Sequence, residues 1–427
     1  MQTLSPISPD QNSTPRAFDA THFLGLAPFL RMSIAGDECT QIAQELVKRA
    51  EQNPDDAVLW MNLSTVMQCL QCTDLGLTIQ NQALAMQQVY TLRAAQQPAR
   101  LRLLMLMVPG TLSANVPLDC LLENSDIELI YYYITPEAPF ESPIPEHDLL
   151  MIGISATTEN LFLLQQLESI TNQWPVPVIN APQHIPSSER HTASRVLQNK
   201  PGLTIAQAHP VTFSTLAAVA AGQITLRDAL PDSDFPIILR PAGSHGGHGL
   251  EKITSQDELA GYLTRVKVED YFLSRFIDYS NEDGQFRKYR ISLIDGVPYA
   301  CHMAISSHWM VHYVNASMYE DPKKREEEAA FLDHFQDFAD RHQQALKAIY
   351  DTTQLDYLGI DCSETPEGTL LVFEIDPAMV VHAMDLEEMF PHKQIHMNKV
   401  KTACRDLLLS RAFAHTDTSD DALKGQK

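Results

Sequence analysis

The pattern of apolar and polar positions changes twice along the chain. From Thr21 to Ala95 apolar residues recur at helical spacing, and Pro54 ends one of the helical stretches. Four continuous apolar runs follow, with another helical stretch at 158–173 between the last two. Continuous apolar runs separated by helices are typical of a parallel β-sheet covered on both faces. We therefore expect a helical layer and then a small α/β domain with strands Leu101–Val108, Ile127–Ile134, Leu149–Ser155 and Val176–Asn180.

From residue 187 onward, segments with helical spacing alternate with the apolar runs of strands. Helical spacing predicts helices over 187–230, 321–352 and 395–414. Two segments with paired apolar runs predict β-hairpins, one turning at Asp295-Gly296 and the other at 366–368. The predicted fold class is therefore α/β and α+β in several domains: a disordered start (1–18), a helical layer (19–97), an α/β domain (98–186), an α+β domain (187–414) and a disordered tail (415–427).

Two helical stretches of the N-terminal layer share the spacing of a short helical repeat. In the first, small Ser64 lies where two helices must approach closely, and Gly76 and Ala83 take the small positions of the second. With Trp60, Leu63 and Met67, these residues resemble one tetratricopeptide repeat beside a degenerate one. Fewer than three repeats rarely stand alone. We expect this layer to pack on the rest of the chain or to bind a peptide, a protein or a second subunit.

Composition limits the class of partner. The chain has 31 Lys and Arg against 54 Asp and Glu, a formal net charge of −23. That charge opposes binding to nucleic acid or to an anionic membrane, and no run is long enough to span a bilayer, so we expect a cytoplasmic protein. Seven scattered Cys argue against a disulfide framework. Cys69 and Cys72 lack a second ligand pair, so we interpret both as small buried hydrophobes.

The C-terminal hairpin, 355–377, carries three carboxylates. Asp361 follows its first apolar run, and Glu374 and Asp376 close the second. Residues two apart on a strand share a face. If Asp361 lies opposite them, the three acids converge and require a cation, and oxygen-only ligands suit Mg²⁺ with substrate phosphates. A solvated hairpin with acidic ends is the alternative.

A glycine-rich loop follows the strand at 234–241. The loop, AGSHGGHGLEKI, holds Gly243, Gly246, Gly247 and Gly249 with Ser244 and His245 between them. Such a loop lets backbone N–H groups approach phosphate oxygens. Arg240, which ends the preceding strand, favours phosphate because a guanidinium binds it through two hydrogen bonds. The alternative is a flexible hairpin loop without a ligand.

The central hairpin is unusually basic for so acidic a chain. Arg287, Lys288 and Arg290 lie close together, and on a strand Lys288 and Arg290 share one face while Arg287 points to the other. We interpret this cluster as functional rather than as a solvated face, because its sign opposes the net charge. The following stretch, 308–319, contains Trp309, His312, Tyr313 and Asn315 and is suited either to recognising a small polar substrate or to packing on the acidic helix after it.

In this order, the glycine loop between strands, the basic hairpin and the acidic hairpin resemble the ATP-grasp superfamily, which includes glutathione synthetase, D-Ala–D-Ala ligase and the ribosomal-protein glutamate ligases. The resemblance covers about 189–414, and the α/β region resembles the domain that precedes the grasp. It implies that Arg240 and the 243–249 loop hold the phosphates of ATP, that Arg290 with Lys288 neutralises the transferred phosphate, and that Asp361, Glu374 and Asp376 bind Mg²⁺. Arg190 is a weaker match to an early cation, and Phe276-Ile277 lie where adenine binds.

The chain departs from the family pattern at three positions. Arg240 replaces the usual lysine, Asp376 the usual asparagine, and Arg275 the glutamate that normally precedes Phe-Ile. Asp376 keeps an oxygen ligand, so Mg²⁺ binding should survive, whereas Arg275 leaves the adenine and ribose contacts open. The resemblance also leaves a homodimer open.

The resemblance implies a carboxylate–amine ligase. ATP phosphorylates a substrate carboxylate, and an amine then displaces phosphate to form an amide, a reaction that depends on positioning and charge neutralisation. The sequence contains no Ser-His-Asp or Cys-His arrangement, in keeping with that chemistry. Two alternatives stay open: a phosphotransferase on the same fold, and a non-catalytic ATP-sensing scaffold whose helical repeats bind a partner.

Overall fold

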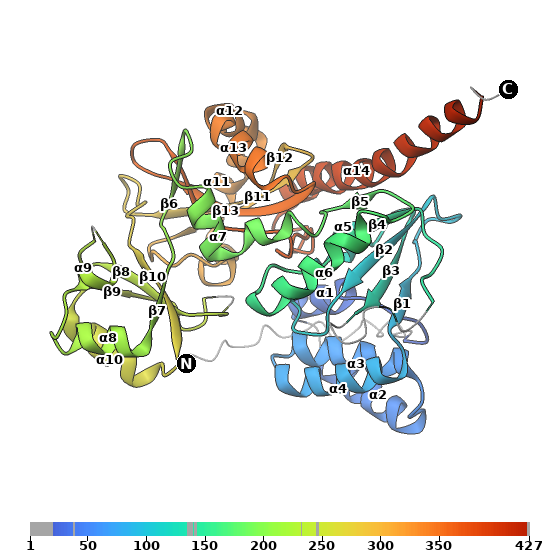
Figure 1. Cartoon of the computed structure of the whole chain (residues 1–427), viewed down its shortest axis with the longest axis horizontal. Helices are drawn as coiled ribbons and strands as arrows, with labels where there is room; N and C mark the ends of the chain where they lie inside the picture. Colours follow the sequence, from blue (N-terminus) through green and yellow to red (C-terminus); the bar gives the residue numbers. More distant parts are fainter. Residues whose placement is uncertain are drawn as a thin grey trace.

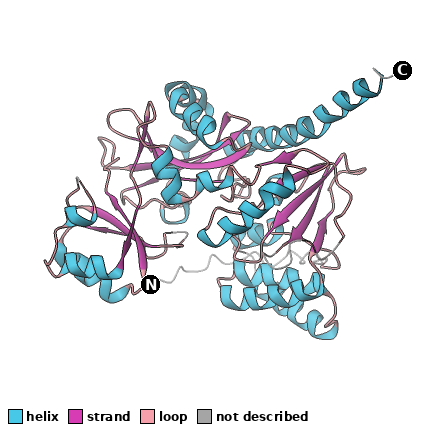
Figure 2. Ribbon diagram, viewed as in Figure 1, coloured by secondary structure: helices cyan, strands magenta, loops and turns pink. Residues whose placement is uncertain are grey.

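The computed structural model describes residues 20–36, 39–134, 140, 143–231, 233–244 and 247–424. Helices α1–α4 lie beside the β1–β5 sheet, two further sheets form the opposite side of the molecule, and α14 extends away from the body (Figure 1). Colouring by secondary structure shows each sheet with helices against it (Figure 2). The disordered start predicted for 1–18 lies outside the described residues.

The N-terminal layer contains α1 (Ala27–Ala35), α2 (Cys39–Gln52), α3 (Ala57–Cys69) and α4 (Thr73–Met86). Small residues allow α3 and α4 to cross closely, as expected. The Ser64 hydroxyl donates to the Gly76 carbonyl at 2.8 Å, and a Cβ at Gly76 would lie 2.6 Å from Cγ of Gln68. The helix pair is confirmed, while its tetratricopeptide character stays a prediction.

The helical layer ends earlier than predicted. Residues after Met86 leave the helix, and β1 (Val89–Leu92) joins the next sheet antiparallel to β3. Tyr90 is fully buried there, and its hydroxyl donates to the Ala83 carbonyl at 3.1 Å. Aromatic and β-branched residues suit a half-buried strand, and this packing outweighs the helical spacing. Cys69 is partly buried but Cys72 is exposed, so the prediction that both are buried is wrong for Cys72.

The α/β domain contains β2 (Leu101–Met107), α5 (Asp119–Leu122), β3 (Ile127–Tyr133), β4 (Leu149–Ile152), η1 (Thr158–Asn160), α6 (Leu161–Thr171) and β5 (Val178–Ile179). The sheet order is β1-β3-β2-β4-β5, and β2 to β5 are parallel, as predicted. Alternate residues of β2 enter two different cores: Leu104 packs in a cluster with α6, and Leu103 in one with α3, α4 and α14. Both faces of the sheet are therefore covered.

A four-stranded antiparallel sheet begins the α+β part, in the order β7-β10-β8-β9. The region predicted to be entirely helical, 187–230, also contains two strands. These two strands form because each pairs with a strand that is distant in sequence: β6 pairs with β14, and β7 pairs with β10. The elements are η2 (Ile185–Ser188), α7 (Arg190–Val196), β6 (Leu203–Ile205), β7 (His209–Thr212), α8 (Phe213–Ala220), α9 (Leu226–Ala229), β8 (Ile237–Pro241), β9 (Glu251–Ile253), α10 (Gln256–Arg265) and β10 (Asp270–Arg275).

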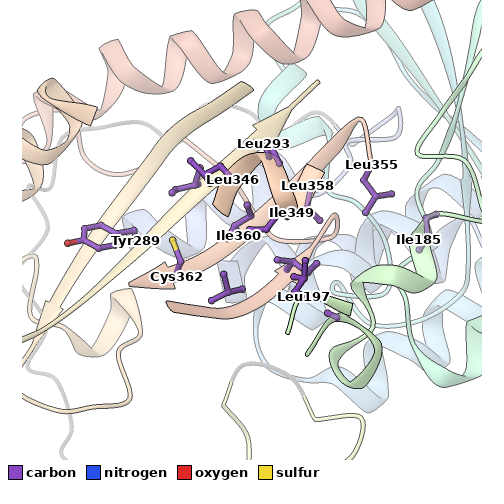
Figure 3. Packing of buried hydrophobic residues seen from close by; sticks show 14 of the residues in the cluster. Ile185, Leu197, Tyr289, Leu293, Leu346, Ile349, Leu355, Leu358, Ile360 and Cys362 are labelled. Carbon is purple, nitrogen blue, oxygen red and sulfur yellow. The ribbon is translucent and has the colours of Figure 1, made fainter. Parts of the chain in front are cut away.

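The last sheet has the order β12-β11-β13-β14-β6. Both predicted hairpins are present, as β11 (Phe286–Ile294) with β12 (Val297–Ser306) and β13 (Tyr357–Glu364) with β14 (Leu370–Asp376). Asp295 and Gly296 have φ of 49° and 76°, the positive values that a two-residue hairpin turn requires. Buried side chains such as Leu293, Leu358 and Ile360 of this sheet pack in one cluster with Leu346 and Ile349 (Figure 3).

The C-terminal helices differ from two predictions. The single helix expected over 321–352 is three, α11 (Pro322–Asp333), α12 (Phe335–Arg341) and α13 (Gln343–Thr353), after η3 (Tyr313–Asn315). His342, at the second break, is buried with its ring nitrogen Nε2 2.8 Å from Oε1 of Glu364, a long-range contact that local spacing does not reveal. Helix α14 (Pro391–Lys424) continues through most of the predicted disordered tail, because no Pro or Gly interrupts it. Within the described residues, none of the helices combines the length and hydrophobicity needed to cross a membrane.

Candidate active site

A cavity of about 810 Å³ lies between the two sheets of the α+β part. One wall consists of β8, β10 and the glycine-rich loop, and the opposite wall consists of β11, β13 and β14. Loops of the α/β domain form a third wall. Predicted site residues that line it are Arg190, Arg240, Gly243, Ser244, Gly247, Phe276, Ile277, Lys288, Arg290, Asp361, Glu374 and Asp376.

Two parts of the predicted glycine loop are not in this lining. A Cβ at Gly249 would lie 2.8 Å from atoms of the Pro241 ring, so this glycine supports the loop from behind. His245 and Gly246 lie outside the described residues. The structure thus brings together predicted residues from α7, from the loop and from four strands, separated by up to 186 positions in sequence, from Arg190 to Asp376.

The acidic hairpin presents its three carboxylates toward the cavity. Asp361 on β13 lies in register with Glu374 on β14, and Asp376 follows two residues later on the same face of β14. Asp361 is 3% exposed. The local register therefore places the acids as the strand alternation predicts.

Asp361 is held by both basic residues of the central hairpin. Arg290 donates from Nε and Nη2 to the two carboxylate oxygens at 2.7 and 2.9 Å, and Lys288 Nζ lies 2.6 Å from Oδ2. Burial alone would raise the pKa of Asp361, but the charges of Arg290 and Lys288 hold it well below its usual range. Arg290 also donates from Nη1 to the Val380 carbonyl at 2.9 Å. Arg287 points to the other face and pairs with Asp283 and Glu327, as the alternation predicts.

Glu374 has a different cationic partner. Its Oε1 lies 2.5 Å from Nη2 of Arg190, at the start of α7. Burial would raise the pKa of Glu374, and the Arg190 charge outweighs it, so the pKa is lowered. No ion pair of Asp376 occurs among the described residues, and burial together with the charge of Glu374 raises its pKa from 3.8 to about 7. Asp376 therefore holds its proton to higher pH than the other two carboxyls of the hairpin.

The three carboxylates predicted to hold a metal ion differ in whether their oxygens are already bonded to cations. Glu374 and Asp376 offer oxygen ligands on one strand face, the donor type that a hard cation prefers. Asp361 has its oxygens engaged by Lys288 and Arg290. No group of three or more acidic, His or Cys side chains within the described ranges is close enough to hold a metal ion as placed. Mg²⁺ binding by all three acids stays a prediction.

Arg240 is a buried cation that faces the cavity. It is 8% exposed and has no ion-pair partner among the side chains that the structure describes. Its Nε donates to the Ser244 hydroxyl at 3.2 Å, and Nη2 donates to the Ser244 carbonyl. Burial and then the charge of Arg190 lower the pKa of Arg240 to about 10. A guanidinium in this setting is poised for an anion.

The glycine loop and the 308–319 segment meet at one side of the cavity. Gly247 has φ of 76°, and a Cβ there would lie 2.6 Å from Nε2 of His312, so only glycine lets the loop pass. His312 and Trp309 line the cavity, whereas the Tyr313 hydroxyl donates to Glu328 of α11 at 3.2 Å. Both interpretations of this segment therefore hold for part of it: Trp309 and His312 face the cavity, and Tyr313 packs on the acidic helix.

Aromatic rings form another part of the cavity lining. Phe276 makes an edge contact with Trp309, with ring centroids 5.9 Å apart, and Ile277 lies beside it. Arg275 is in register with Ile237, whose side chain belongs to the core beneath α8 and α10. Arg275 nevertheless belongs to the lining of the cavity, beside Phe276. The adenine and ribose contacts therefore stay open at this position.

Sequence reasoning missed a buried network behind the 308–319 segment. Lys393 of α14 is 2% exposed, and its Nζ lies 2.9 Å from Oδ2 of Asp385 and 3.4 Å from Oε1 of Glu328. These residues come from three separate segments, and no local motif joins them. Sequence reasoning also missed the α/β wall of the cavity, which Thr111, Ser155 and the 156–159 loop provide.

No protein-family model matches the chain, and none of the curated proteins does. Solved structures that match this chain include D-alanyl-alanine synthetase A from Vibrio cholerae, 12% identical with a TM-score of 0.46 over 74% of this chain and 99% of that one. The D-alanine-D-alanine ligase from Coxiella burnetii is 12% identical with a TM-score of 0.45 over 76% and 99%. A RimK-domain ATP-grasp protein from Sphaerobacter thermophilus is 13% identical with a TM-score of 0.39 over 72% and 99%. At these scores the likeness carries no argument about function, which therefore depends on the geometry of the site.

Proposed function

We propose that this chain is an ATP- and Mg²⁺-dependent carboxylate–amine ligase that acts through an acylphosphate. The observation that supports the proposal most directly is Arg240. A buried guanidinium without an acidic partner among the described residues is unfavourable unless an anion binds it. It lies under a glycine loop and opposite a carboxylate pair, the surroundings that a metal-bound triphosphate requires.

The cations of the cavity are arranged for phosphoryl transfer. Arg240 and the backbone of the 243–249 loop bind the phosphates on one wall, while Lys288 and Arg290 face them from the other. On nucleotide binding, the phosphate oxygens take over hydrogen bonds that Asp361 now receives from Arg290 and Lys288. The aromatic end at Phe276 and Trp309 accepts the base. Small-molecule substrates then occupy the remaining volume.

The chemistry needs no protein nucleophile. A carboxylate oxygen of the substrate attacks the γ-phosphorus, the bond to the bridging oxygen of ADP breaks, and an acylphosphate forms. The amine nitrogen attacks the acyl carbon, inorganic phosphate leaves, and the nitrogen loses a proton. Lys288 and Arg290 neutralise the charge on the transferred group, and closure of the loop against His312 excludes water. Glu374 and Asp376, with Asp361, would hold Mg²⁺, which supplies charge neutralisation at the phosphates.

The test is ADP release with ATP and Mg²⁺ in the presence of pooled amino acids, small carboxylic acids, amines and peptides. Wild type is compared with Glu374→Gln and with the double variant Asp361→Asn/Glu374→Gln. Glu327→Gln is the matched control, because Glu327 pairs with Arg287 on the opposite face of the same sheet. We expect release that requires one pool, forms an amide, and falls at least about 100-fold in the site variants but not in the control.

Other outcomes decide between the alternatives. A stable phosphorylated product without an amide would identify a phosphotransferase. ATP binding with no release from any pool would instead favour the nucleotide-sensing scaffold. Release that persists in the double variant would refute the assignment of the acidic hairpin to catalysis.

A further inference from the structure

A buried lysine lies behind the 308–319 segment. Lys393 of α14 is 2% exposed, and its Nζ contacts Oδ2 of Asp385 at 2.9 Å and Oε1 of Glu328 at 3.4 Å. The same Nζ donates to the Tyr313 hydroxyl and lies 3.9 Å from the centroid of the Tyr313 ring. Replacing buried ion pairs by apolar residues of similar volume is often neutral or stabilising. Stability alone therefore does not account for these buried charges.

The first segment that these charges hold forms part of the cavity wall. Tyr313, which contacts the ammonium group, directly follows His312 of the cavity lining. At the other end of the segment, the Tyr319 hydroxyl donates to Oδ1 of Asp385 at 2.7 Å. The 308–319 segment is therefore fastened at two points, and one of them adjoins the residue that faces the glycine loop.

The second segment is the loop that follows β14, residues 377–385. It begins directly after Asp376, one of the predicted metal ligands, and ends at Asp385. Within it, the Val380 carbonyl accepts from Nη1 of Arg290 at 2.9 Å. Arg290 lines the cavity. The loop therefore holds one arm of the guanidinium that the proposed function assigns to the transferred phosphate.

We infer that Lys393 is a positioning residue for the proposed reaction. Its ammonium group contacts Tyr313 of one segment and Asp385 of the other, so it holds both in a single arrangement. Arg290 thereby keeps one geometry toward the transferred phosphate, although Lys393 takes no part in bond making. A misplacement of about 1 Å can lower a reaction rate about 100-fold. The effect on rate rests on the proposed function, whereas the joining of the two segments is measurable without turnover.

Three single variants test the inference. Lys393→Met removes the charge and keeps a long side chain, and Tyr313→Phe removes only the hydroxyl that the ammonium group contacts. Tyr90→Phe is the matched control, because the Tyr90 hydroxyl also has a hydrogen bond, to the Ala83 carbonyl, but Tyr90 does not line the cavity. Amide hydrogen exchange and Tm are measured on the nucleotide-free protein, and ATP affinity, KM and kcat on the same preparations.

Exchange reports whether one residue joins the two segments. In Lys393→Met, the amides of both 308–319 and 377–385 should exchange at least about tenfold faster than in wild type. Tyr313→Phe should speed exchange in 308–319, and Tyr90→Phe should leave both segments unchanged. Faster exchange in only one segment of Lys393→Met would overturn the inference. If Lys393→Met does not fold, unchanged exchange in 308–319 of Tyr313→Phe would overturn it equally.

Kinetics separates positioning from a structural role. Lys393→Met and Tyr313→Phe should lower kcat roughly 10- to 100-fold and change ATP affinity by less than about twofold, while Tyr90→Phe keeps the wild-type kcat. A kcat that follows Tm across all three variants would mean that Lys393 is only structural. A wild-type kcat in both site variants would refute the inference and leave the ligase standing. Coupled exchange in a protein that never turns over ATP would support the joining of the segments and refute the proposed function.

Discussion

Replacing Asp361 by asparagine removes the carboxylate that Lys288 and Arg290 share. Removing one partner of a fully buried ion pair costs about 3–5 kcal/mol, because the remaining charge is left uncompensated. Here the Lys288 and Arg290 side chains keep 16% and 21% of their exposure, so water offsets part of the loss. We expect the variant to lose about 2–3 kcal/mol and its Tm to fall by roughly 2–4 °C without nucleotide.

ATP should reverse much of that loss. In wild type the phosphates compete with Asp361 for the two cations, whereas in Asp361→Asn the cations are free for them. ATP in EDTA should therefore raise the Tm of the variant more than that of wild type, measured by thermal unfolding across a nucleotide titration. Asp283→Asn is the control, because it removes a partner of Arg287 on the opposite strand face. A smaller ATP shift in Asp361→Asn than in wild type would refute the view that Lys288 and Arg290 move from Asp361 to phosphate.

Four further predictions follow from single contacts. Arg240→Met should weaken ATP binding roughly 10- to 150-fold in calorimetry without lowering Tm, because the lost guanidinium has no acidic partner among the described residues. Asp376, with a pKa of about 7 against an ordinary 3.8, keeps its proton in the folded chain after the unfolded chain has lost it, so stability in EDTA should fall from about pH 4 to pH 7, and Asp376→Asn should abolish that slope. Gly247→Ala should cost roughly 1 kcal/mol in the free energy of unfolding and weaken ATP binding, because the new Cβ strains the backbone and meets His312. Asp119 accepts from the N–H groups of Leu26 and Ala27 at 2.6 and 2.8 Å, so Asp119→Ala should cost about 1–3 kcal/mol by denaturant unfolding.

The parts of the site that were predicted from sequence are those that depend on local geometry. Strand alternation places Lys288 and Arg290 on one face and Arg287 on the other, and a two-residue spacing places Glu374 with Asp376. Turn residues define both hairpins. These features need only the neighbours along the chain, so the sequence pattern is sufficient for them.

The parts that were missed depend on partners far apart in sequence. The Arg190–Glu374 contact spans 184 residues, and no spacing rule connects its ends. Strand β6 has three residues and forms because β14 offers it an edge. The burial of Ser155 is equally invisible in sequence, because a serine after an apolar strand does not show that its hydroxyl is buried and has no partner among the described residues.

Local and overall electrostatics act in opposite directions in this molecule. A net charge of −23 repels ATP at long range, while Arg190, Arg240, Lys288 and Arg290 attract it inside the cavity. Salt screens the diffuse repulsion of exposed charges more strongly than it weakens contacts in a buried site. Under the proposed function, the acidic surface slows the arrival of the nucleotide, and the cations of the cavity determine how tightly it is held. The proposal therefore requires phosphate to displace Asp361 and Glu374 from those cations inside a molecule that is acidic as a whole.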